Sequence, residues 1–291
     1  MNQTSMTLPA AFPMRFNFAI LAGLLLAMEP LVASSQPPDI PKIVREASWN
    51  ELHSSGPPHY FRYRTSEQDP DGSNVKLVIQ TRDGTVVRTI NKGGQPLSAE
   101  ANAVEIARLK NLLAHPEIQQ KRHRSESQNS NREDELVRML PDAFVYTYEG
   151  MVKGPNGPCY RLSSIPNPSF VPPDREGEVF HGMVGELWID QSQLRIVKID
   201  AHLISDVNFG WGVLGKLYRG GSILEENADV GEPNVHHWES TQLRLRLTGK
   251  ILMIKSVDYS TTQVFTDFHP VPSDTTYQQA IQMLLDDPGT Q

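Results

Sequence analysis

The most regular pattern in the chain is an alternation of hydrophobic and polar residues over residues 182–268. It opens with an apolar stretch, a polar turn at residues 190–193 and a second stretch that alternates cleanly. Further along, Leu243, Leu245 and Leu247 alternate with arginines. Because successive side chains of a strand point to opposite faces, the pattern predicts an antiparallel sheet with one apolar face and one solvated face.

The rest of the chain predicts further strands separated by helices. Helices are expected where apolar residues recur at helical spacing behind a capping residue, as behind Asp39 and Ser98. The polar stretch 116–132 is predicted to be an exposed helical extension or a mobile loop, and residues 165–174 are too rich in proline for an interior strand. The expected helices span residues 39–52, 98–114, 133–140 and 277–285. The further expected strands span residues 59–65, 75–82, 85–91, 143–148, 159–164, 216–218, 222–227, 236–239, 242–248 and 250–266.

These elements predict an α+β fold in which a curved antiparallel β-sheet, a half-barrel, is covered by helices. Residues 34–291 are expected to form a single domain of this kind, with a helical insert at about residues 98–141. A chain of this length buries about 75% of its unfolded surface, which allows a sizeable core.

The N-terminus predicts export. Arg15 precedes an apolar run, Phe16 to Met28, and small residues follow up to Ser35. A charged start, an apolar centre and a small-residue cleavage site are the parts of a secretory signal, so residues 1–33 are interpreted as a signal peptide, with Met1 or Met14 as its start. The expected location is periplasmic or secreted.

The cysteine and charge content narrow the function further. Cys159 is the one cysteine, and it lies far from the signal, so we expect no lipobox and no internal disulfide. The net charge of −7 and the pI of about 5.7 argue against nucleic acid as a partner. The basic cluster at residues 121–124 is interpreted as a solvated surface, with contact to anionic lipid as the alternative.

Sequence motifs give no catalytic residue, no metal site and no cofactor. The stretch Gly210 to Gly215 matches G-x-G-x-x-G, but the glycine-broken segment behind it predicts no nucleotide-binding helix, so a bend in the sheet is the better account. His237 and Glu239 share a strand face, whereas His236 points the other way, and two ligands make a weak metal site. Paired carboxylates on distant strands, as in a secreted hydrolase, stay open as an alternative.

Aromatic residues of the second group of strands are the candidate ligand contacts. The concave face of a curved sheet needs an apolar cover, which helices can supply and which the acyl chains of a ligand can also supply. The predicted ligand-binding residues are Trp188, Phe209, Trp211, Tyr218 and Trp238.

The hairpin Gly185–Asp190, short polar turn, Leu194–Ile199 resembles the recurrent hairpin of the lipoprotein-localisation-factor (LolA/LolB-like) superfamily. The resemblance covers about residues 143–268 and is also close to exported proteins of soil bacteria. It implies an antiparallel half-barrel closed by helices around a hydrophobic cavity. The charged segment 116–135 and the proline-rich loop 165–174 depart from that pattern.

Together these observations predict a non-enzymatic carrier-like protein of the periplasm that binds a lipid or the acyl chains of a lipoprotein. Two alternatives remain from the sequence. One is an envelope module that binds or senses another protein, and the other is the secreted hydrolase.

Overall fold

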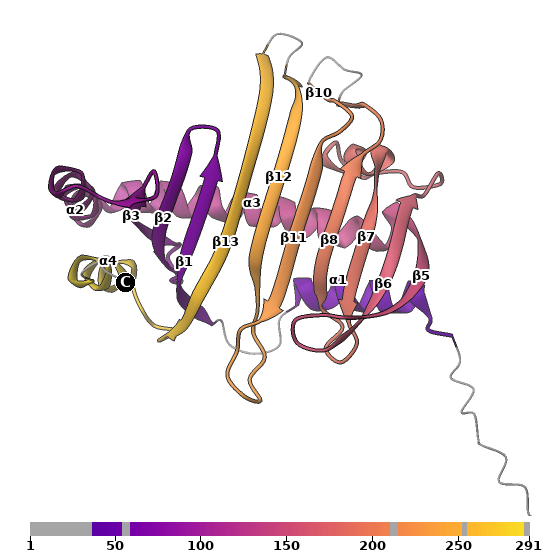
Figure 1. Ribbon diagram of the computed structural model, residues 1–291, viewed down its shortest axis with the longest axis horizontal. Helices are drawn as coiled ribbons and strands as arrows, with labels where there is room; N and C mark the ends of the chain where they lie inside the picture. The colour runs from indigo at the N-terminus through magenta and orange to yellow at the C-terminus, as the bar shows by residue number, and fades with distance from the viewer. Residues whose placement is uncertain (1–36, 54–58, 210–214, 252–254, 288–291) are drawn as a thin grey trace, which may run out of the picture. The chain divides into compact units, whose positions relative to one another are not determined.

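The computed structural model describes residues 37–53, 59–209, 215–251 and 255–287. Residues 38–291 cluster as one compact unit. Its described part is dominated by one antiparallel sheet, which is curved, open and covered by helices (Figure 1). The predicted α+β half-barrel is therefore confirmed.

The described residues form a sheet of 13 strands. The strands are β1 (Tyr60–Asp69), β2 (Gly72–Ile79), β3 (Val86–Lys92), β4 (Gln95–Pro96), β5 (Phe144–Lys153), β6 (Pro158–Pro166), β7 (Met183–Asp190), β8 (Ile196–Leu203), β9 (Val207–Phe209), β10 (Gly215–Leu217), β11 (Ser222–Asp229), β12 (Trp238–Ile251) and β13 (Lys255–Val271). Their order is β4-β3-β2-β1-β13-β12-β11-β8-β7-β6-β5, and the short β10 pairs with β12 and β9. The pairing of β1 with β13 places the first and the last strand of the chain side by side within the sheet.

Three of the described α-helices, α1, α2 and α4, begin at residues whose side chains cap them. The described helices are α1 (Ile40–Leu52), α2 (Ala99–Ala114), α3 (Pro116–Ala143), α4 (Tyr277–Asp286) and the 3₁₀ helix η1 (Glu176–Gly182). Asp39 accepts a hydrogen bond from the Lys42 N–H at 3.1 Å, and Ser98 accepts one from the Ala101 N–H at 3.2 Å. Both predicted caps are thus confirmed. Within the ranges that the structure describes, no helix combines the length and the apolar character that a membrane crossing requires.

Helix α3 corrects the prediction for residues 116–140. Residues 116–132 were expected to be an exposed helical extension or a mobile loop, followed by a separate helix at residues 133–140. The helical alternative is confirmed, but the two segments form one helix of 28 residues that runs through Pro141 (Figure 1). Gln119 is fully buried and donates to the carbonyls of Asp83 and Thr85, at 3.1 and 3.4 Å. Polar contacts of this kind leave no apolar periodicity, so the pattern could not reveal them.

The last two long strands also differ from the predicted boundaries. Residues 238–239 and 242–248 belong to one strand, β12, which continues to Ile251, whereas residues 236–237 of the predicted strand precede it. The strand expected at 250–266 begins at Lys255 instead. The register shifts at Thr241 of β12, because the consecutive residues Glu226 and Asn227 of β11 pair with Gln242 and Ser240, which explains why the alternation looked interrupted.

Register identifies the two faces of the sheet. Leu243 pairs with Gln263, and Gln263 pairs with Glu67, so these side chains share one face. Leu77 pairs with Arg64, three positions from Glu67, and therefore points to the opposite face. We call the face of Leu243 the inner face and the face of Leu77 the outer face.

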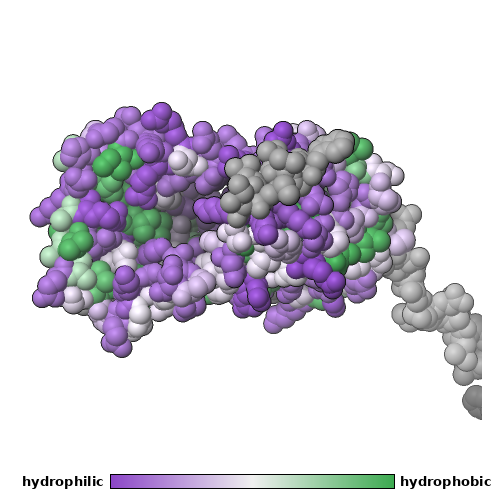
Figure 2. All heavy atoms as spheres, turned by 90° about the horizontal axis from the view of Figure 1, so that it is seen from above, coloured by the Kyte–Doolittle hydropathy of each residue, from purple (hydrophilic) through white to green (hydrophobic). Residues whose placement is uncertain are grey.

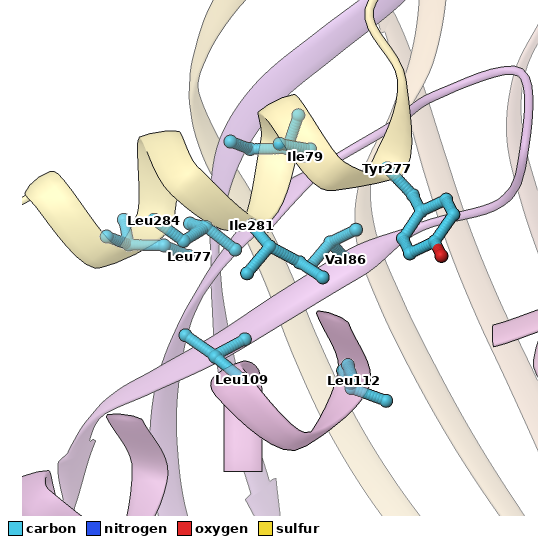
Figure 3. Close-up of a cluster of buried hydrophobic side chains, with 9 residues drawn as sticks. Leu77, Ile79, Val86, Leu109, Leu112, Tyr277, Ile281 and Leu284 are labelled. Atoms are coloured by element: carbon cyan, nitrogen blue, oxygen red, sulfur yellow. The ribbon is translucent and has the colours of Figure 1, made fainter. Parts of the chain in front are cut away.

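One core lies on the outer face at the β1–β3 end of the sheet. Helices α2 and α4 pack there against β2 and β3 (Figure 3). Its buried residues are Leu77, Ile79, Val86, Leu109, Leu112, Tyr277, Ala280, Ile281 and Leu284. This packing explains the C-terminal helix, whose capping box at Thr276 and Gln279 fixes its start.

Two further cores lie at the β5–β8 end and involve α1 and α3. In one, Ile40, Val44 and Ala47 of α1 pack on strands β6 to β8. In the other, the last turns of α3 pack against β5 and η1, with Phe144 and Phe180 ring-to-ring at 5.3 Å. Seen from above, hydrophobic residues gather toward both ends of the molecule (Figure 2).

Candidate apolar binding site

A pocket of about 290 Å³ lies between the inner face and the C-terminal half of α3. Leu136, Val137 and Leu140 of α3 form its roof, and strands β7, β8, β11 and β12 form its floor. Phe144 of β5 and Phe180 of η1 belong to its end wall. Its volume is near the lower end of the roughly 300–1,000 Å³ of ligand pockets, which suits one slender apolar group.

The floor follows directly from strand register. Ser164, Gly185 and Ala201 lie opposite one another on β6, β7 and β8, and Ala201 then pairs with Ile223, which pairs with Leu245. Three small residues in one row leave a hollow, and large residues on either side bound it. A Cβ added at Gly185 would lie 2.6 Å from the Ala201 Cα, so the close approach of β7 and β8 requires glycine there.

The roof is tied down by hydrogen bonds to its own carbonyl groups. The Ser48 hydroxyl of α1 donates to the Val137 carbonyl at 2.6 Å. The Tyr146 hydroxyl of β5 donates to the Leu140 carbonyl at 2.9 Å, and burial raises the pKa of Tyr146 strongly, so it stays a donor at neutral pH. Both acceptors belong to residues that line the pocket.

Two glutamates bring charge into this apolar lining. Glu225 of β11 and Glu133 of α3 both line the pocket. Burial raises the pKa of the Glu225 carboxyl, and the negative charges of Glu133 and Glu51 raise it further. Burial, followed by the charge of Asp134, likewise raises the pKa of Glu133.

The inner face changes character toward β1 and β2. A hollow of about 430 Å³ there is lined by polar residues, among them Gln80, Glu126 and Glu239. Burial raises the pKa of Glu239, and the pKa of Tyr63 rises to about 12 through burial and the charges of Glu239 and Glu126. Glu126 accepts from the N–H and the hydroxyl of Thr85, at 3.0 and 2.7 Å.

The histidine and glycine motifs of the sequence have structural surroundings of their own. His237 packs against His59 with ring centroids 3.7 Å apart, and His236 pairs with Asp229. No group of three His, Cys, Asp or Glu side chains in the described ranges could hold a metal ion. Residues 210–214 of the glycine motif lie outside the described residues, and the segment after them is strand β10 rather than a helix.

The predicted aromatic ligand contacts lie elsewhere on the sheet. The Trp188 Nε1 donates to Glu186 at 3.2 Å, and Lys198 lies 5.0 Å from its ring centre; its neighbour Leu187 is the side chain that points inward. Phe209 ends β9, Tyr218 follows β10 beside Lys216, and Trp238 starts β12. None of these four lines the pocket. Trp211 lies outside the described residues, and a ligand-binding role for the set stays a prediction.

The residues that form the pocket were not singled out by the sequence. The leucines of β12 were recognised as one apolar face, but small residues such as Gly185 and Ala201 carry no signal by themselves. Their alignment across three strands depends on register, which a single sequence does not reveal. Cys159, in contrast, is buried on β6, where burial and Asp190 raise its pKa to about 11, so it remains a thiol.

No protein-family model matches the chain, and no curated protein matches its sequence. Among solved structures, an outer membrane lipoprotein-sorting protein domain from Vibrio parahaemolyticus is 11% identical, with 84% of this chain and 97% of that chain covered and a TM-score of 0.32. A LolA superfamily protein from Nitrosomonas europaea is 11% identical, with coverages of 78% and 91% and a TM-score of 0.25. A DUF1329 family protein from Desulfovibrio piger is 12% identical, with coverages of 79% and 93% and a TM-score of 0.28. At these TM-scores the likenesses do not bear on function.

Proposed function

We propose that this protein is an exported, non-enzymatic carrier that holds an acyl chain of a lipid or lipoprotein in the pocket between α3 and the inner face. The pocket is the observation that supports the proposal. Its lining is mostly aliphatic and aromatic, and a chain placed there would gain about 0.8 kcal/mol for each methylene removed from water. Export rests on residues 1–33, whose pattern is that of a signal peptide.

Release of the chain would require α3 to lift from the floor. The hydrogen bonds from Ser48 and Tyr146 hold the roof at Val137 and Leu140, directly above the pocket. Breaking either bond lowers the cost of opening by roughly 0.5–1.5 kcal/mol, the net contribution of one such bond. The two hydroxyl groups are therefore the proposed latch of the carrier.

Neighbouring positions of β11 allow a matched test. Ile223 points into the pocket, whereas Leu224 points to the outer face. Ile223→Trp should fill the pocket and abolish binding of a fluorescent fatty-acyl probe, and Leu224→Trp should leave binding unchanged. The amount of lipid that co-purifies with the exported protein, measured by mass spectrometry, should also fall in Ile223→Trp and stay unchanged in Leu224→Trp. Equal binding by both variants would refute the proposal.

A second candidate function, capture of an envelope protein, is favoured by the free edge of the sheet. β5 is the end strand, and Val145 and Ile165, paired across β5 and β6, are 47% and 59% exposed. An edge strand offers unpaired backbone groups to an added strand. Val145→Lys should then reduce capture of the partner while leaving the acyl probe bound, and the opposite outcome would remove this candidate.

A further inference from the structure

The pocket carries negative charge that the described chain does not neutralise. Glu225 lies on the inner face, paired with Ile199 and Leu243, and Glu133 reaches the same pocket from α3. Glu225 is half-buried and Glu133 is exposed, and neither carboxylate takes part in a hydrogen bond or ion pair within the described ranges. An ionised carboxylate in an apolar lining is costly unless a cation or a donor approaches it.

The Lys and Arg side chains of β6, of β8 and of the turn before β8 pair with other carboxylates. Arg195 binds Glu51 in a two-pronged pair, with N–O distances of 3.0 and 2.7 Å. Arg161 pairs with Glu186, which also borders the pocket. Lys198 lies 3.3 Å from Asp200 and 3.9 Å from Glu226. Among the described residues that line the pocket there is no Lys, Arg or His.

The negative charges that raise the pKa of Glu225 come from α3 and α1. Glu133 comes from α3, and Glu51, with its Arg195 partner, comes from α1. The flanking strands contribute the apolar side chains of Ile199 and Leu243. An anionic head group at this position would meet the like charge of the half-buried Glu225 and of Glu133, whereas a cationic head would supply the missing counter-charge.

We propose that the pocket selects a cationic amphiphile, in which an ammonium head lies between Glu225 and Glu133 and the alkyl chain fills the hollow of Ala201 and Ile223. The inference rests on the proposed carrier function and specifies the class of its ligand. Lipids with a phosphate or carboxylate head as their only charge are disfavoured. An amine or quaternary ammonium head satisfies the site without any change in the fold.

Three surfactants with the same dodecyl chain test the proposal, each kept below its micelle concentration. They are dodecyltrimethylammonium, dodecyl maltoside and dodecyl sulfate, and the measurement is calorimetric titration of the full mature chain. The cation should bind tightest and the sulfate weakest. Glu225→Gln should weaken binding of the cation by about tenfold and leave the maltoside unchanged. Glu226→Gln, one position along on the outer face, is the matched control and should change neither.

The pH dependence gives a second readout. The quaternary ammonium does not titrate, so any change reports the carboxyl groups of the pocket. Because the pKa of Glu225 lies above its usual value in the free protein, affinity for the cation should rise as pH increases through that raised pKa. Glu225→Gln should flatten this rise, while its circular dichroism and melting curve confirm that it folds.

The outcomes separate the inference from the proposed function. Equal or tighter binding of the sulfate, or an unchanged preference for the cation in Glu225→Gln, would overturn the inference and leave the carrier function standing. If none of the three surfactants binds, the carrier function itself fails. Tighter binding of the cation, lost in Glu225→Gln and retained in Glu226→Gln, would support both.

Discussion

The two halves of the inner face are covered by the same helix and held by different chemistry. Toward β5–β12, α3 presents Leu136, Val137 and Leu140 to an apolar floor, and space is left between them. Toward β1–β3, α3 presents Gln119 and Glu126, which hydrogen-bond to the loop between β2 and β3. In the apolar half a pocket lies beneath α3, whereas in the polar half α3 is hydrogen-bonded to the β2–β3 loop.

The difference shows how one long helix can close a sheet and still leave a site open. Directional bonds at the N-terminal half of α3 fix its position. The C-terminal half can then cover a hollow without having to fill it, because contact with the sheet is already secured elsewhere. At the polar end of the sheet the hydrophobic core lies on the opposite, outer face, where α2 and α4 bury Leu77, Ile79 and Val86 (Figure 3).

On its strands each half also carries one glutamate whose pKa is raised by burial, and these two glutamates show the same contrast. Glu239 in the polar half accepts from the Gln80 amide at 3.5 Å. Glu225 in the apolar half has no such donor among the described residues, and the charge of Glu133, which lines the same pocket, raises its pKa further. The unneutralised carboxylate therefore lies where the pocket is.

The largest expected effect is a loss of stability when the outer-face core beside the polar half is disrupted. Ile281 of α4 is fully buried, and Ile281→Ala should lower the free energy of unfolding by about 2–5 kcal/mol, since it removes apolar contacts and leaves a cavity. Urea denaturation measures this loss. Met283→Ala, at a position that is 39% exposed, is the control and should cost far less. An equal loss in both variants would contradict the packing described for α4.

The second effect concerns the hydrogen bonds that fix α3. Gln119→Ala leaves the carbonyls of Asp83 and Thr85 without their donor, so the free energy of unfolding should fall by about 1–3 kcal/mol. Gln120→Ala, on the exposed side of the same turn, should be nearly neutral. If Gln119→Ala does not lower the free energy of unfolding, these hydrogen bonds do not position α3, and the two halves are not held by different interactions. Hydrogen exchange of α3 would show the same difference locally.

Sequence reasoning predicted the strands and capped helices because their signals are local. The alternation of β12 and the caps Asp39 and Ser98 were read correctly for that reason. For residues 116–132 the choice between helix and loop stayed open, since Gln119 of α3 is buried through bonds to residues more than 30 positions away. The pocket was missed for a related reason, because the row of Ser164, Gly185 and Ala201 exists only once three strands are in register.

A smaller effect sharpens the comparison at the roof of the apolar half. Ser48→Ala removes the bond to the Val137 carbonyl and should lower the free energy of unfolding by about 1 kcal/mol. Dissociation of the acyl probe, followed by stopped-flow fluorescence, should become several-fold faster because the roof opens more easily. Thr89→Ala, in the polar half, should leave the dissociation rate unchanged. A slower or unaltered rate in Ser48→Ala would exclude α3 as the moving element.

The smallest expected effect concerns how stability depends on pH through the two half-buried glutamates, Glu225 and Glu239. In the folded protein the pKa of Glu225 lies above its usual 4.5, so the unfolded chain releases this proton first as pH rises, and stability falls between pH 4.5 and the raised pKa. Glu225→Gln should remove that part of the decline and make the protein slightly more stable than the wild type at neutral pH. Glu239→Gln should increase the stability at neutral pH by less, because the Gln80 amide already stabilises the Glu239 carboxylate. Urea denaturation from pH 4 to 8 measures both. A loss of stability in Glu225→Gln at neutral pH would mean that its carboxylate has a partner in the folded protein, and the pocket would then have no charge to offer a cationic ligand.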